Sequence, residues 1–254
     1  MKTNRRNAVL LSVLAAVGVC NPKSNFGQSA ASENETQYSS SIEIAAKYSA
    51  ADFAPDGNLD KKIWKKANWA ELDRDKAGRT ENPIALTRVA AAWTDHFIYF
   101  AFVCRYDLLN IFEGEDISKE RWELWNRDVV EVFLNPQPER MTHYYEFEVA
   151  PNNQWIDLEI EKKNNPFNDA SWNSGFEHAT QIDAKRHTWT AEMRIPLSAI
   201  NAKTVHEGDA WRVNFFRAAG HGDDNKRLFL AWSAIPQGQT FHMPSRFGIL
   251  SFHK

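Results

Sequence analysis

The stretch WIDLEIE, residues 155–161, indicates the fold most clearly. Its two isoleucines and its leucine alternate with acidic residues, which is the period-two pattern of a strand with one face in the core. The stretch TWTAEMRI, residues 188–195, alternates in the same way. In both stretches we expect the apolar side chains to face inward, and the acidic ones, including Asp157 and Glu192, to face water.

Runs of the same β type follow one another along the chain, with few helical patterns between them. The other runs are 84–94, 97–105, 128–134, 144–149, 211–218, 228–232 and 247–252. A short helix is expected around residues 59–67 and a single helical turn at 196–200. This pattern predicts an all-β fold: a two-sheet antiparallel β-sandwich, jelly-roll or immunoglobulin-like, with one or two short helices.

The amino terminus has the pattern of a secretory signal peptide over residues 1–31. A basic segment precedes an apolar run from Ala8 to Val19, which is too short to span a membrane. Cys20 ends this run where a bacterial lipoprotein carries its lipidated Cys, but the residues before it fit that pattern poorly. We therefore expect a secreted or periplasmic protein, with lipid anchoring at Cys20 as the less favoured alternative.

The signal is followed by a polar linker, residues 32–41, and one domain, residues 42–254. Removing residues 1–31 takes away four cations and no acids, which changes the net charge from −3 to −7. An acidic domain repels phosphate backbones, so no nucleic-acid partner is expected. The chain also holds 10 Trp, 6 Tyr and 16 Phe, more than a core of this size normally needs, which points to a ligand with flat apolar faces.

A series of short segments resembles, in its order along the chain, the family 9 carbohydrate-binding module. The segments are Leu59-Asp60 with Trp64, Val89 to Asp95 with Ile98-Tyr99, Trp125 to Phe133, Tyr145 to Phe147, Trp189 with Glu192 to Pro196, Trp211 to Phe215, Ala231 to Ser233 and Phe241 to Gly248. The resemblance covers about residues 42–254. It implies a β-sandwich that binds the end of an oligosaccharide or polysaccharide between two aromatic rings, often beside xylan-degrading glycoside hydrolases. It also implies bound calcium, whose ligands the sequence does not identify.

The resemblance assigns roles to four residues. Trp125 takes the first aromatic position and Phe241 the second, where the well-studied binder of the family has Trp. Glu131 takes the position of the carboxylate that accepts sugar hydroxyls. Glu148 stands where that binder has Arg, so a donor is lost beside Glu131 and the sugar specificity is left open. The chemistry is sound, because the C–H faces of a pyranose stack on aromatic rings while its hydroxyls bond to charged groups at the rim.

Four further residues lie near these motifs. Asp128 is given a hydrogen-bonding role, because three positions along a strand put it on the opposite face from Glu131. Arg217 and Trp232 are candidates for the border of the site, and His242 is a candidate donor to a sugar hydroxyl. The structural alternatives stay open: Trp125 as a packed residue at a strand start, Glu131 as a solvated strand residue, Phe241 as a core residue and His242 as a solvated loop residue.

Two other functions compete with sugar binding. A glycoside hydrolase needs two carboxylates about 5–9 Å apart, but with 33 acidic residues in the chain such pairs arise by chance. A haem-binding electron-transfer domain of similar fold needs axial ligands, for which Met141, Met193 and Met243 are candidates. We expect Met193 to lie in the core. A non-catalytic carbohydrate-binding domain is the prediction that best accounts for the ordered motifs.

Overall fold

The structure is a computed structural model that describes residues 37–114, 116–202, 204–220 and 226–254. The predicted signal peptide, residues 1–31, and Cys20 within it lie outside the described residues, as does the first half of the predicted linker. Among the residues that the structure describes, no helix has the length and apolar character that a membrane span requires.

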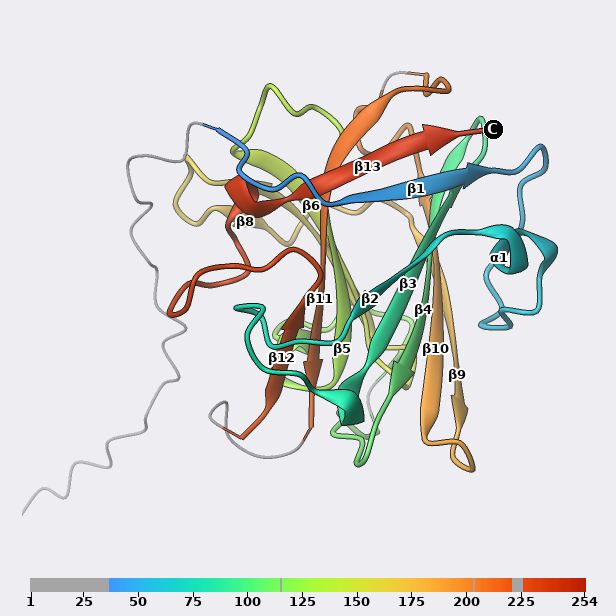
Figure 1. Cartoon of the computed structure of the whole chain (residues 1–254), viewed down its shortest axis with the longest axis vertical. Helices are drawn as coiled ribbons and strands as arrows, with labels where there is room; N and C mark the ends of the chain where they lie inside the picture. The colour runs from blue at the N-terminus through green and yellow to red at the C-terminus, as the bar shows by residue number, and fades with distance from the viewer. Residues whose placement is uncertain (1–36, 115, 203, 221–225) are drawn as a thin grey trace, which may run out of the picture. The chain divides into compact units, whose positions relative to one another are not determined.

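Nearly all the regular secondary structure of the described chain is β-strand (Figure 1). The strands are β1 (Glu43–Tyr48), β2 (Trp69–Leu72), β3 (Thr87–Trp93), β4 (Phe97–Arg105), β5 (Val129–Asn135), β6 (His143–Val149), β7 (Trp155–Glu161), β8 (Asn168–Asp169), β9 (Glu177–Asp183), β10 (Thr188–Pro196), β11 (Ala210–Ala219), β12 (Leu228–Ala231) and β13 (Gly248–His253). The helical elements are α1 (Lys62–Lys66) and the 3-10 turns η1 (Pro83–Ala85), η2 (Leu124–Asn126) and η3 (Pro244–Arg246). The predicted all-β class is confirmed.

The strands form two halves that face each other. One half has the order β8-β7-β6-β5-β11-β13, with β12 also paired to β11, and the other has β3-β4-β10-β9, with β2 paired to β3. Strand β1 pairs in parallel with both β13 and β3, so it joins the halves into one continuous hydrogen-bonded path. The remaining pairs between these strands are antiparallel, as expected for the sandwich.

Three apolar clusters explain why these strands stack. The central cluster lies between the halves and takes residues from both, for example Phe100 of β4, Met193 of β10 and Phe215 of β11. A second cluster covers the other face of β5, β6, β7 and β11, and we call that face the outer face of the β5–β6 half. The third covers the outer face of β3 and β4 and includes Trp64 of α1. Each sheet half is thus covered on both faces.

Coverage of both faces corrects two predictions from the alternating stretches. Glu192 of β10 is 1% exposed, because the segment before and within α1 packs over it. Asp157 of β7 is also buried, where the backbone N–H and the hydroxyl of Ser174 donate to its carboxylate. The apolar positions of β10 face the central cluster, as predicted. Those of β7, Ile156, Leu158 and Ile160, face the outer cluster instead, and Asp157 lies on the central side beside Phe147, so the predicted inward direction is wrong for β7. Neither acidic residue faces water, because other parts of the chain cover both.

Candidate functional site

Three glutamates lie together on the outer face of the β5–β6 half. Glu131 of β5 pairs directly with Glu148 of β6, and Glu146 precedes Glu148 by two residues. Because alternate residues of a strand share a face, the register brings the three side chains to one place. One carboxylate oxygen from each lies within 4.8 Å of the others. We call Glu131, Glu146 and Glu148 the glutamate cluster.

The glutamate cluster is buried. Glu131, Glu146 and Glu148 are 2%, 3% and 0% exposed. Burial, helped by the carboxylate of Glu146, raises the pKa of Glu131 well above its usual value, against the opposing effect of Arg227. Burial raises the pKa of Glu146 to about 7, and burial with both neighbouring carboxylates raises that of Glu148 well above its usual value. Each pKa shifts in the direction of the neutral form because a negative charge there is poorly solvated.

Aromatic side chains surround the cluster on this face. Phe241 stacks on Phe216 of β11 at 4.1 Å between ring centroids and 9° between planes, and Phe216 pairs with Glu131 in the sheet. Phe229 of β12 meets Phe241 edge-on at 6.1 Å. Trp125 lies in η2 and belongs to the same apolar cluster.

An arginine connects Trp125 to the rings around Phe241. Arg227 donates to the carbonyl oxygen of Trp125 at 2.5 Å and to that of Arg127 at 3.1 Å. Its guanidinium lies 5.0 Å from the centroid of the Phe229 ring. The two predicted aromatic positions are therefore linked through Arg227 and Phe229, although they are 116 residues apart in sequence.

His242 also lies on this face. The phenol oxygen of Tyr144 is 2.8 Å from its Nδ1, and its Nε2 is 3.9 Å from Glu146. Burial, with a smaller contribution from the positive charge of Lys162, lowers the pKa of His242. The imidazole is therefore neutral near pH 7, which leaves it able to donate or accept a hydrogen bond but not to balance the charge of the cluster.

The structure brings five of the eight predicted residues together, namely Trp125, Glu131, Glu148, Phe241 and His242. Asp128 and Arg217 do not join them. They form a buried pair at 3.4 Å, and the Arg217 guanidinium lies over the ring of Trp189 in the central cluster. The reason is strand parity: both point to the face opposite the glutamate cluster, as predicted for Asp128.

Trp232 also points away from the outer face. Its ring packs on Phe215 of the central cluster at 5.4 Å. It also lies so close to Gly248 that a Cβ there would be 2.5 Å from the indole. Trp232 therefore packs in the central layer, and the structure does not support its place at the border of the site.

Sequence reasoning missed Glu146 and Arg227. The sequence did carry a signal for Glu146. It is two residues from both Tyr144 and Glu148 in HYYEFEV, residues 143–149, so the three side chains share one face of the strand. Arg227 comes just before β12, and nothing in the sequence indicates that it would return to Trp125.

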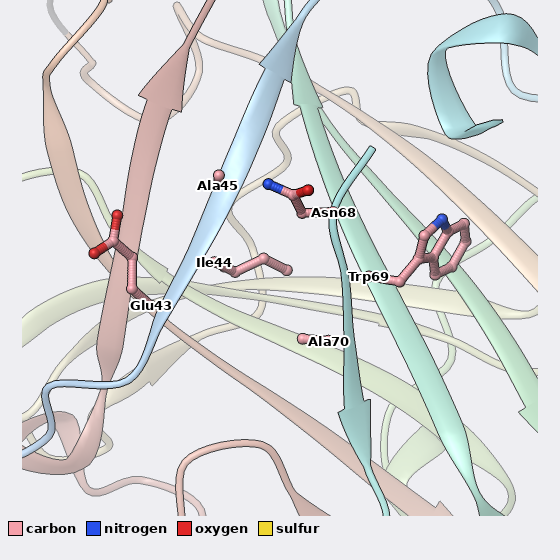
Figure 2. A pocket seen from close by; sticks show the side chains of 6 residues that line it. All are labelled: Glu43, Ile44, Ala45, Asn68, Trp69 and Ala70. Carbon is pink, nitrogen blue, oxygen red and sulfur yellow. The ribbon is translucent and has the colours of Figure 1, made fainter. Parts of the chain in front are cut away.

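Two hollows elsewhere on the domain are lined by other residues. A pocket of about 240 Å³ lies where β1 and β2 separate, lined by Glu43, Ile44, Ala45, Asn68, Trp69 and Ala70 (Figure 2). A larger one of about 470 Å³ lies near β7 and β8, where His143 is 2.7 Å from Glu159. Neither is lined by a residue of the predicted sugar site.

The chain is similar to known proteins over most of the domain. A sequence profile of the family described as carbohydrate family 9 binding domain-like matches residues 56–254. A curated protein of Arthroderma benhamiae, named "Extracellular protein", is 25% identical over 197 residues, which cover 72% of this chain and 86% of that protein.

Two solved structures have a similar fold. One is a family 9 carbohydrate-binding module from Caldicellulosiruptor kristjanssonii in complex with cellotriose; it matches with a TM-score of 0.61 at 18% identity, over 84% of this chain and 94% of that one. A structure from Bacteroides uniformis matches with a TM-score of 0.67 at 19% identity, over 84% and 100%. The resemblance inferred from the motifs is confirmed. The chain belongs to the carbohydrate family 9 binding domain-like family.

Proposed function

We propose that this protein is a secreted, non-catalytic carbohydrate-binding domain that holds a sugar unit at the outer face of the β5–β6 half, between Trp125 and Phe241. The observation that carries the proposal is the contact chain through Arg227 and Phe229, which connects the two aromatic positions on the face that also holds Glu131. Aromatic faces stack on the C–H groups of a sugar, and polar groups at the edge bond to its hydroxyls.

The glutamates support binding better than catalysis. Glycoside cleavage requires that two carboxyl groups reach the glycosidic bond and that water enters. Glu131 and Glu148 are nearly or fully buried, so neither meets these requirements. Because the glutamates are buried, we assign the first contact with a sugar to the partly exposed Trp125, Phe241 and His242. A hydrogen bond from a sugar hydroxyl to Glu131 then requires these side chains to move apart.

The solved structures of similar fold support a proposal for the sugar class. The structure from Caldicellulosiruptor kristjanssonii contains cellotriose, and a second one contains glucose. We therefore propose that the chain binds ends of glucose-based oligosaccharides. Secretion is supported by the signal pattern of residues 1–31 and by the extracellular relative. A role beside a glycoside hydrolase in polysaccharide breakdown, xylan included, completes the proposal.

Replacing Trp125 by alanine is expected to weaken sugar binding about five- to thirtyfold. Loss of one stacking face removes about 1–2 kcal/mol, and 1.4 kcal/mol is a factor of ten in affinity. The measurement is titration of the full chain with cello-, xylo- and manno-oligosaccharides, following Trp fluorescence.

The matched control is Trp69→Ala, because Trp69 is also half-buried but lines the separate 240 Å³ pocket. This control should bind like the wild type. The proposed site is wrong if no sugar changes the spectrum, or if the two variants bind alike. Release of reducing sugar by the full chain would show that the domain is catalytic.

A further inference from the structure

The glutamate cluster lacks the partners that buried carboxylates need. Four of its six oxygens, one on Glu131, one on Glu146 and both on Glu148, are buried with no hydrogen-bond partner among the described residues. Buried polar atoms are nearly always hydrogen-bonded, and buried charges are paired or bind metals. This arrangement needs either bound protons or a bound cation.

A further unpartnered group lies on the same face. Gln154 is 1% exposed, and its amide nitrogen and oxygen both lack a hydrogen-bond partner. The backbone carbonyl of Gln154 accepts a hydrogen bond from the N–H of Ala150. Glu148 pairs with Ile156, and Gln154 precedes Ile156 by two residues, so Gln154 is a diagonal neighbour of Glu148. Diagonal neighbours on one face are within reach of long side chains. The amide oxygen of Gln154 is a fourth candidate ligand.

We infer that the glutamate cluster binds one calcium ion, with Glu131, Glu146 and Glu148 as carboxylate ligands and Gln154 as an amide ligand. Carboxylate and amide oxygens suit hard cations, and Ca²⁺ binds six to eight of them at about 2.3–2.6 Å. Two oxygens on opposite sides of such an ion are about 4.6–5.2 Å apart, so ligand atoms that lie within 4.8 Å of one another fit around it.

The charges and the dryness of the site favour calcium. Three carboxylates share one buried place, so a divalent ion offsets more of their charge than a monovalent ion does. Mg²⁺ keeps several waters and dehydrates reluctantly, which suits a buried site poorly.

The inference goes beyond sugar binding and is tested without sugar. The full chain is stripped with EGTA and melted with and without CaCl₂, and calorimetry gives the stoichiometry. Calcium at a hundredfold excess over its Kd is expected to raise the Tm by about 5–10 °C, with one ion per chain, and Mg²⁺ to raise it less.

The variants Glu148→Gln and Glu146→Gln keep the shape of the side chains and remove one charge. Each is expected to abolish the calcium shift while remaining folded, since repulsion within the cluster falls. The control is Glu120→Gln, because Glu120 is another glutamate with its pKa raised by burial, to about 7, but it lies outside the cluster. This control should keep the full shift. The inference is overturned if calcium does not raise the Tm of the wild type, or if it raises the Tm of Glu148→Gln as much as that of Glu120→Gln. Neither result bears on the sugar titration of Trp125→Ala, which tests the proposed function separately.

Discussion

Replacing Glu192 by alanine is expected to lower the free energy of unfolding by about 4 kcal/mol. The carboxylate of Glu192 accepts hydrogen bonds from the backbone N–H groups of Asp56 and Gly57, both at 2.9 Å. It also accepts from Lys61 at 2.6 Å and from the indole of Trp64 at 2.5 Å. Truncation leaves the two backbone N–H groups and the indole without this acceptor, whereas Lys61 keeps Asp56 and the carbonyl of Asn58. An unmet buried donor costs about 1–3 kcal/mol.

The loss is expected to fall on the docking of one segment. Glu192 joins the segment from Asp56 to Trp64, which includes the first half of α1, to the outer face of β10. The measurement is urea unfolding of the full chain, with exposure of Trp64 followed by fluorescence. The control is Glu177→Ala, which removes an exposed glutamate of β9 that pairs with Arg194 of β10. A surface pair contributes about 0–1 kcal/mol, so equal losses in the two variants would contradict the prediction.

Glu192 also shows how far the strand pattern can be read. The alternation in residues 188–195 correctly predicts which side chains enter the central cluster, because burial of the apolar positions decides the strand's orientation. It does not predict whether the other face meets water. Whether that face meets water depends on which distant segment covers it. In β10 the covering segment is residues 56–64, which contact Glu192. Asp157 was misread for a different reason: the apolar residues of β7 face the outer cluster, so Asp157 lies on the central side beside Phe147, where Ser174 donates to it.

Strands were predictable where the apolar residues alternate and not elsewhere. All nine predicted runs contain a strand of the structure, whereas β1, β2, β8 and β9 were missed. Strand β9 pairs with β10 alone and is mostly half-buried or exposed, so its sequence EHATQID carries no apolar period. Strand β1 buries only Ile44 and Ala46, and its parallel pairing with β13 depends on residues about 200 positions away.

The candidate site was assigned from motifs rather than from alternation. Trp125, Glu131 and Phe241 were assigned because their segments resemble a family, and the structure places all three on one face. The burial of Glu131 was not predictable, because the aromatic cover comes from β11, β12 and the segment after β12. The parity of Asp128 was predictable, and that of Arg217 required the register of β11 with β5.

The pair of Asp128 and Arg217 gives the second large effect. Replacing Asp128 by alanine is expected to lower the free energy of unfolding by about 3–5 kcal/mol, because it leaves the fully buried guanidinium of Arg217 without its carboxylate. The N–H of Gly220, which donates to Asp128 at 2.8 Å, also loses its acceptor. Urea unfolding at pH 7 measures the loss.

A double variant separates the cost of breaking the pair from the value of the pair. Burial raises the pKa of Asp128 although Arg217 acts to lower it, so the desolvation of the carboxylate exceeds the attraction between the two charges. Asp128→Ala combined with Arg217→Met removes both charges and keeps an apolar side chain over Trp189. We expect this double variant to be no less stable than Asp128→Ala alone, since buried pairs replaced by apolar residues often lose little. Losses that simply add, as for independent sites, would show that Arg217 stabilises the core by packing on Trp189 and not through its charge partner.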